Sequence, residues 1–191
     1  SELDGNKVMA DCIDGIYGKE VHYIKNQTAQ WLEMDESYLQ RMEHFFLIRD
    51  PAAVIVSYSK VRPTIHLDDM GFDLLYQLYC KVVDLGFDPL VIHCDEISKD
   101  PELAMKTICK KHKIDFDSKM LSWEKGGGMD PLFPSWYQGV INSTGFAPYV
   151  KKEISVPEEY TEILAECQKW YDLLAPKAIT QDQMRKYVNG D

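Results

Sequence analysis

The sequence lacks the features that mark several classes of protein. Its five cysteines, Cys12, Cys80, Cys94, Cys109 and Cys167, are scattered and form no CxxC pair. This pattern argues against a disulfide framework or a zinc site, and it is typical of a reducing, cytoplasmic compartment. No pair of histidines has metal-ligand spacing. No apolar run approaches the roughly 18 residues that a membrane span needs, and no signal peptide is visible.

Positive charge is also scarce. The 21 Lys and Arg residues are outnumbered by 31 Asp and Glu, which gives a formal net charge of −10. We therefore expect neither a nucleic-acid partner nor an anionic membrane surface. Any anion that the protein binds must be held by a local pocket against the overall field. The 191 residues suit a single domain over 1–191, long enough to bury a substantial core.

Hydrophobic patterns alternate between strand and helix along most of the chain. Short apolar runs predict strands at 20–24, 44–48 and 89–93, and the run at 44–48 is continuous enough for a strand covered on both faces. Helical spacing predicts helices over 28–42, 51–59, 68–85, 98–112 and 157–175, the last a terminal helix. Strands that alternate with helices predict a parallel sheet in an α/β fold.

The region 125–150 has a different composition. It holds five of the eleven glycines and three prolines, together with Trp136 and Tyr137 as aromatic anchors. We expect a long ordered loop with a short helix inside it. A compact domain that retains such a loop usually uses it for function.

A charged residue ends the strand predicted at 44–48. The run "HFFLI" continues directly into Arg49, Asp50 and Pro51, which supply an N-cap and a first residue for the next helix. Ligands of open α/β sheets bind at the carboxyl ends of strands, and Ser57 follows Arg49 by about two helical turns. Arg49 and Ser57 can therefore close on one phosphate. Alternatively, Arg49 pairs with Asp50 or Glu96, and Ser57 is an ordinary helix residue.

The stretch "FFLIRDPAAVIVSYS" (45–59) resembles the core motif of the P-loop sulfotransferases, in which a strand leads into Arg, Asp or Asn, and Pro, and Ser follows eight residues after the Arg. The resemblance implies a three-layer P-loop-type parallel sheet flanked by helices. It also implies 3′-phosphoadenosine 5′-phosphosulfate as the sulfuryl donor, with Arg49 and Ser57 holding its 3′-phosphate. The donor chemistry needs no metal.

Other segments resemble the same family, over roughly residues 18–175. "VHYIKNQ" looks like the family strand that ends in a lysine, which makes Lys25 a candidate for neutralising charge on the transferred group. From the residues alone, Lys25 is equally well a solvated lysine. "LSWEKGGG" resembles a C-terminal segment whose Lys-Gly pair, here Lys125 and Gly126, reaches the same phosphate. "CDEISKDP" resembles an acidic pair, Asp95 and Glu96, with an architectural role.

The sequence departs from the family pattern in two places. The Gly-rich phosphate-binding loop and the first strand before it are missing from these residues, and Gln27 stands where many relatives carry a histidine base. His66 is the one loop histidine beside carboxylates and is the alternative acid or base. We therefore expect a C-terminal portion of the domain, a chain completed by an upstream segment or a second chain, or a member without catalysis.

The resulting expectation is a sulfotransferase that transfers a sulfuryl group to a hydroxyl or amine of a small-molecule acceptor, as part of a longer chain. The alternative is a non-catalytic sulfotransferase-like module that binds a nucleotide or a protein. A P-loop kinase is disfavoured by the spacing between the Arg-Asp-Pro motif and Ser57. The acceptor is not determined by any motif in the chain.

Overall fold

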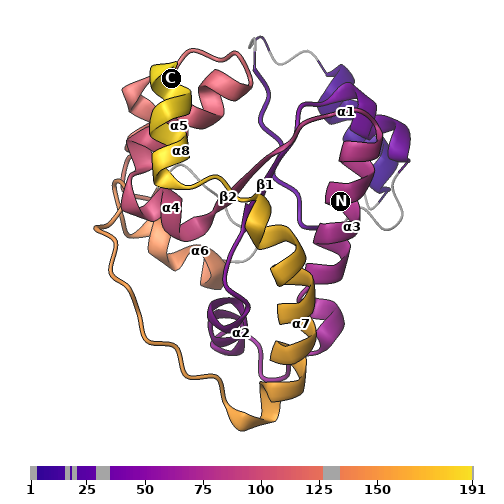
Figure 1. The fold of residues 1–191 in the computed structure, drawn as a ribbon, viewed down its shortest axis with the longest axis vertical. Helices are drawn as coiled ribbons and strands as arrows, with labels where there is room; N and C mark the ends of the chain where they lie inside the picture. Colours follow the sequence, from indigo (N-terminus) through magenta and orange to yellow (C-terminus); the bar gives the residue numbers. More distant parts are fainter. Residues whose placement is uncertain (1–3, 16–17, 19–20, 29–34, 127–133, 191) are drawn as a thin grey trace. The chain divides into compact units, whose positions relative to one another are not determined.

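The computed structural model describes residues 4–15, 18, 21–28, 35–126 and 134–190 (Figure 1). The chain divides into two compact units. The first comprises Ser1–His44 and Gly71–Pro89, and the second comprises Phe45–Met70 and Leu90–Asp191. The expectation of one domain over 1–191 stays a prediction.

A parallel two-stranded sheet lies at the centre of the second unit. β1 (Phe45–Ile48) pairs with β2 (Leu90–His93), and the register places Phe46 beside Val91 and Ile48 beside His93. The strands predicted at 44–48 and 89–93 and their parallel pairing are confirmed. The fold is α/β, with helices making up most of its regular structure.

The helix after β1 begins as the sequence predicts. α2 (Pro51–Ser59) has Asp50 as its N-cap, and the Asp50 carboxylate accepts a hydrogen bond from the Ala53 amide at 3.1 Å. Pro51 occupies the first turn, where a missing N–H costs nothing. The turn from β1 into α2 is thus fixed by two adjacent residues.

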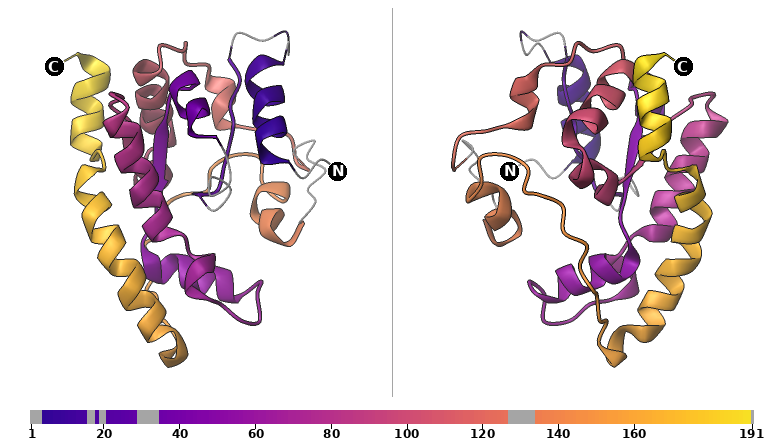
Figure 2. Two further views of the ribbon diagram at one scale, coloured as in Figure 1. Left: turned by 90° about the vertical axis from the view of Figure 1, so that its right-hand side faces the viewer. Right: turned by 60° about the vertical axis from the view of Figure 1, so that its left-hand side comes forward.

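One face of the sheet is covered by α5 (Pro101–Lys111) and α8 (Gln181–Asn189), which lie side by side in Figure 2. Ile92 of β2, Ala104 and Ile108 of α5, and Met184 of α8 form a buried cluster there. The opposite face carries Phe46 and Val91, which are also buried. The centre of β2, at Val91 and Ile92, is therefore buried on both faces of the sheet.

The other elements of the second unit differ in detail from the sequence expectations. α4 (Cys94–Lys99) follows β2 directly, and Asp100 separates it from α5 by capping Leu103 at 3.0 Å. The helix predicted over 98–112 corresponds to α5 (Pro101–Lys111), which begins after Asp100. α7 (Thr161–Leu174) begins a turn later than expected, because η5 (Glu158–Tyr160) precedes it. The remaining short helices are η3 (Leu67–Asp69), η4 (Ser118–Leu121) and η6 (Ala175–Lys177).

The expected loop at 125–150 contains α6 (Pro134–Ile141), in agreement with the prediction of a short internal helix. Residues 127–133 and the side chain of Trp136 lie outside the described structure. The base of the loop is closed by an antiparallel bridge between Ser122 and Gly145. A Cβ at Gly145 would lie 3.1 Å from the Leu121 carbonyl, so this position favours glycine.

The first unit contains α1 (Gly5–Asp14), the 3₁₀ helix η2 (Glu36–Arg41) and α3 (Phe72–Asp84). Arg41 pairs with Asp14, and Lys81 pairs with Glu36, so ion pairs join η2 to both helices. Gly71 is the N-cap of α3 and has a φ of +63°, and the Thr28 hydroxyl donates to its carbonyl at 3.2 Å. Part of the helix predicted over 28–42 lies outside the described residues, and 36–41 form η2.

The strand predicted at 20–24 is wrong for the residues that the structure describes. Residues 21–26 have no regular secondary structure, and β1 and β2 are the two strands of the sheet in the described ranges. Val21 and Tyr23 are 50% and 66% exposed. A strand is stabilised by pairing its backbone and burying one face, and this segment does neither despite its β-branched and aromatic residues. No helix in the described ranges is long and apolar enough to span a membrane.

Candidate functional site

The carboxyl ends of β1 and β2 form the candidate site in the second unit. Ile48 and His93 are register partners, so the next residues, Arg49 and Cys94, follow the strands at the same edge of the sheet. This is the edge at which open α/β sheets bind ligands. The Arg49 guanidinium is close enough to act electrostatically on the Cys94 thiol.

Arg49 is exposed, and within the described part of the chain its side chain makes no hydrogen bond or ion pair. The two carboxylates that could have paired with it are engaged elsewhere. Asp50 caps α2, and Glu96 pairs with Lys99 at 2.5 Å. In the structure, Arg49 therefore pairs with neither Asp50 nor Glu96.

The N-terminus of α2 is already occupied by the Asp50 carboxylate, which accepts from the Ala53 amide. A negative cap satisfies the helix dipole that would otherwise attract an anion. An anion at this edge must therefore be recognised by side chains more than by helix amides. Ser57, in the second turn of α2, is exposed and offers a hydroxyl.

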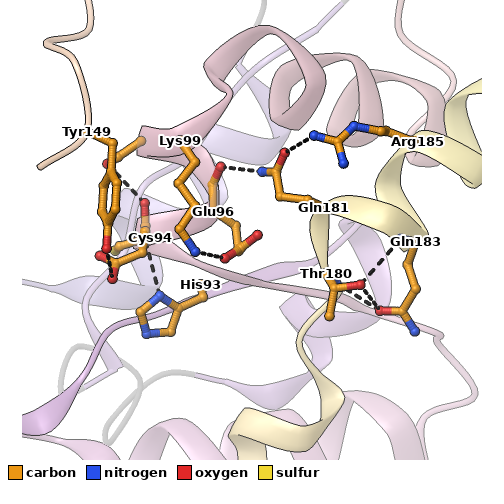
Figure 3. A network of polar contacts seen from close by, with 11 residues as sticks. His93, Cys94, Glu96, Lys99, Tyr149, Thr180, Gln181, Gln183 and Arg185 are labelled. Carbon is orange, nitrogen blue, oxygen red and sulfur yellow. Dashed lines mark hydrogen bonds and ion pairs between the residues drawn. The ribbon is translucent and has the colours of Figure 1, made fainter. Parts of the chain in front are cut away.

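The end of β2 carries a network of polar contacts (Figure 3). His93 caps α4 by accepting the Asp95 amide on Nδ1 at 3.1 Å, and this bond assigns the ring proton of neutral His93 to Nε2. The Tyr171 ring of α7 lies edge-on to His93 with centroids 6.2 Å apart. Asp95 Oδ2 accepts a hydrogen bond from the Tyr149 hydroxyl at 3.0 Å.

The same network continues along α4 to α8. Lys99 binds Glu96 and lies 5.5 Å from the Tyr149 ring centroid, while the Gln181 amide donates to the Glu96 carbonyl at 2.9 Å (Figure 3). The contacts of Asp95 and Glu96 join α4 to neighbouring segments. They fit the architectural role that the sequence resemblance implies.

Burial and nearby charge perturb the ionisable groups around the strand ends. Burial raises the pKa of the Cys94 thiol, and the Arg49 guanidinium opposes that rise. Burial also raises the pKa of Tyr171, with further contributions from the Asp50 and Asp95 carboxylates. Tyr171 therefore stays protonated close to both strand ends. Across the described ranges, no group of three or more His, Cys, Asp or Glu side chains could hold a metal ion.

The remaining predicted site residues lie elsewhere. Lys125 is exposed, and the Gly126 amide donates to the carbonyl of Ile141, the last residue of α6, at 2.9 Å. His66 is exposed at the start of η3, and its amide donates to Asp69. Lys25 is exposed and belongs to the first unit, as does Gln27. Within the second unit, the described structure shows no hydrogen bond or ion pair between Arg49 and Lys125, Gly126 or His66.

Sequence reasoning missed several residues at the strand ends. His93 and Cys94 could have been found by the rule that selected Arg49, because they end and follow the strand predicted at 89–93. Tyr149 and Tyr171 gave no local signal, since Tyr149 is 54 residues from Asp95 and is brought there by the tertiary fold.

Comparison with known proteins agrees with the motif at 45–59. A family model described as a sulfotransferase domain matches residues 4–176, which is most of the chain and includes both strands and the candidate site. The chain belongs to this sulfotransferase domain family. α8 lies beyond the matched residues, and no solved structure matches the chain.

Two curated relatives come from Arabidopsis thaliana. They are named branched-chain-amino-acid aminotransferase-like protein 2 and protein 1, and they are 31% and 32% identical to this chain over 176 residues. The alignments cover 91% of this chain but 31% and 32% of the relatives. The chain thus spans about a third of the length of the curated relatives that it matches.

Proposed function

We propose that this chain is the donor-binding part of a sulfotransferase that uses 3′-phosphoadenosine 5′-phosphosulfate. Arg49 and Ser57 hold the 3′-phosphate, and the acceptor is a hydroxyl or amine of a small molecule. The observation that carries the proposal is the exposed guanidinium of Arg49 at the carboxyl edge of the sheet, with no partner in the described structure. Family membership supports the same reaction class.

In this proposal, Arg49 and Ser57 make different contacts with the same phosphate. A guanidinium makes bidentate, charge-assisted contacts with a phosphate, and a hydroxyl adds one hydrogen bond. Because the Asp50 carboxylate already accepts the Ala53 amide at the start of α2, we place the phosphate along the helix, between the strand end and its second turn. Lys125 adds charge to this site in our proposal, and Lys25 or His66 acts on the transferred group or on the acceptor proton.

The donor supplies a sulfuryl group that passes from a phosphate oxygen to the acceptor, while the acceptor loses a proton. Holding the groups in line and stabilising charge on the transferred group each contribute several kcal/mol in reactions of this type. Residues 1–191 contain no Gly-rich loop after a strand that could hold the 5′ end of the donor in line and stabilise its charge. We propose that an upstream segment or a second chain supplies that loop. The added residues also complete, next to β1, the parallel sheet of a three-layer fold in which helices flank the sheet.

The test is transfer of radiolabelled sulfate from the donor to a panel of hydroxyl and amine acceptors. Residues 1–191 should show weak donor binding and no measurable transfer, and a chain extended upstream should bind tightly and turn over. Robust turnover by residues 1–191 would overturn the requirement for the extra segment. Donor binding without transfer in the extended chain would favour the non-catalytic module, for which Gln27 in place of a base is the supporting observation.

A further inference from the structure

Residues 146–157, which we term the strap, connect the Ser122–Gly145 bridge to η5 and α7 without any regular secondary structure (Figure 2). Every strap residue is exposed except Tyr149 and Val156. A segment with so few buried side chains is held in place by those few contacts. Tyr149 is therefore a principal attachment of the strap to the body of the second unit.

Tyr149 attaches the strap to the candidate site itself. Its hydroxyl donates to Asp95 Oδ2 at 3.0 Å, and the Lys99 ammonium lies 5.5 Å from its ring centroid (Figure 3). Asp95 follows Cys94, which is beside Arg49 at the sheet edge. Burial and the bond to Asp95 raise the pKa of the Tyr149 phenol, so the donor of this bond keeps its proton at neutral pH.

Two lysines follow the attachment point immediately. Lys151 and Lys152 are exposed, and the described structure gives neither an ion pair. An extended chain advances about 3.3–3.6 Å per residue, so both backbones lie within roughly 11 Å of that of Tyr149. The pair therefore places two exposed positive charges close to the point at which Tyr149 attaches the strap. In a chain of net charge −10, this is a local concentration of positive charge near the strand ends.

We propose that the strap completes the anion site. Tyr149 is a positioning residue that holds the strap on Asp95, and Lys151 and Lys152 are binding residues that add their charge to a nucleotide phosphate held by Arg49. This inference rests on the proposed function for its ligand. The attachment of the strap by Tyr149 is independent of any ligand and can be tested separately.

The binding test is calorimetric titration with adenosine 3′,5′-bisphosphate at several salt concentrations. A Lys151→Gln/Lys152→Gln variant should bind roughly three- to tenfold more weakly at low salt, with a smaller difference at high salt because exposed charges are screened. The control is Lys119→Gln/Lys186→Gln, which removes two exposed lysines of η4 and α8 and leaves the affinity unchanged. Equal affinity of the strap variant and wild type at every salt concentration would overturn the role of the lysines.

The positioning test is limited trypsin digestion without nucleotide, scored by mass spectrometry for cleavage after Lys151 and Lys152. Tyr149→Phe removes only the hydroxyl, so strap cleavage should accelerate several-fold because the attachment opens more often. Tyr187→Phe, on α8, serves as the control and leaves the rate unchanged. An unchanged rate in Tyr149→Phe overturns the attachment, whether or not the nucleotide binds. Absence of nucleotide binding by wild type overturns the proposed function and the role of the lysines, even where trypsin confirms the attachment.

Discussion

Leu47 of β1 and Ile92 of β2 are register partners on the same face of the sheet, yet Leu47 is 47% exposed and Ile92 is completely buried. Ile92 is covered by α5 and α8, whose Ala104, Ile108 and Met184 pack on it. No comparable cover lies over Leu47 in the described residues. The face of the sheet that carries Leu47 and Ile92 is therefore covered at β2 and exposed at Leu47, although the sequence of β1 predicted a strand covered on both faces.

The two strand ends differ in the same sense. At the end of β2, His93, Asp95 and Glu96 are satisfied by Tyr149, Lys99 and neighbouring amides. At the end of β1, Asp50 is satisfied, while the described structure offers the Arg49 guanidinium no hydrogen-bond or ion-pair partner. A satisfied network holds its elements in place, whereas an open charge is available to a ligand. We infer that the residues after β2 hold the elements of the site in place, and that Arg49, after β1, contacts the ligand.

The largest expected effect is a difference in folding between a variant of β2 and a variant of β1. Ile92→Asp should abolish cooperative folding, because an unpaired buried carboxylate costs several kcal/mol. Leu47→Asp, at the exposed register partner, should retain a folded chain with a much smaller loss of stability. Urea unfolding followed by circular dichroism compares them directly. Equal loss in both variants would show that β1 is as fully covered as β2.

A smaller effect is expected from the two Asp-Pro caps, which have the same local geometry but should differ in their effect on ligand affinity. Asp50 accepts the Ala53 amide at 3.1 Å, and Asp100 accepts the Leu103 amide at 3.0 Å. Replacing either with Ala should cost about 1 kcal/mol of unfolding free energy. Asp50→Ala should also strengthen binding of adenosine 3′,5′-bisphosphate, because it removes a negative charge beside Arg49, whereas Asp100→Ala should not. Equal affinities in the two variants would separate Asp50 from the ligand.

Cys94 reports on the charge of Arg49. The guanidinium lowers the pKa of the Cys94 thiol against the effect of burial, so Arg49→Gln should raise that pKa and reduce the thiolate fraction. Alkylation of Cys94 at pH 8 should slow by roughly two- to tenfold, measured by peptide mass spectrometry. Cys12, in the first unit, is the internal control and should react at its original rate. Faster alkylation of Cys94 in the variant would contradict the described electrostatics.

The smallest expected effect is on alkaline stability. The pKa values of Tyr149 and Tyr171 are raised, chiefly by burial, so the folded chain holds these protons more tightly than the unfolded chain does. Their contribution is complete below about pH 10 and is lost as the pH rises through the folded values. Tyr171→Phe should therefore lose less stability between pH 9 and 11 than wild type. A steeper loss in the variant would contradict the direction of this shift.

The parts of the fold that the sequence predicted depend on neighbouring residues. An apolar run that ends in Arg-Asp-Pro determines β1, its exit and the start of α2 within fifteen residues. The run at 20–24 has equal strand propensity, but it has no buried face in the structure. α8 has local helix signals, but the sequence does not show that its Met184 packs on Ile92 of β2. The Tyr149–Asp95 contact is likewise a product of tertiary structure. Local sequence therefore located Arg49, and the fold supplied its surroundings.

The most direct test of the central claim is calorimetric titration of adenosine 3′,5′-bisphosphate into wild type, Arg49→Gln and Arg62→Gln. Arg62 is exposed beyond the far end of α2 and controls for the loss of one positive charge. We expect Arg49→Gln to lose about 2–4 kcal/mol of binding free energy, roughly a 30- to 1,000-fold weakening. Arg62→Gln should match wild type. Equal affinity in wild type and Arg49→Gln would contradict the account and remove Arg49 from the site.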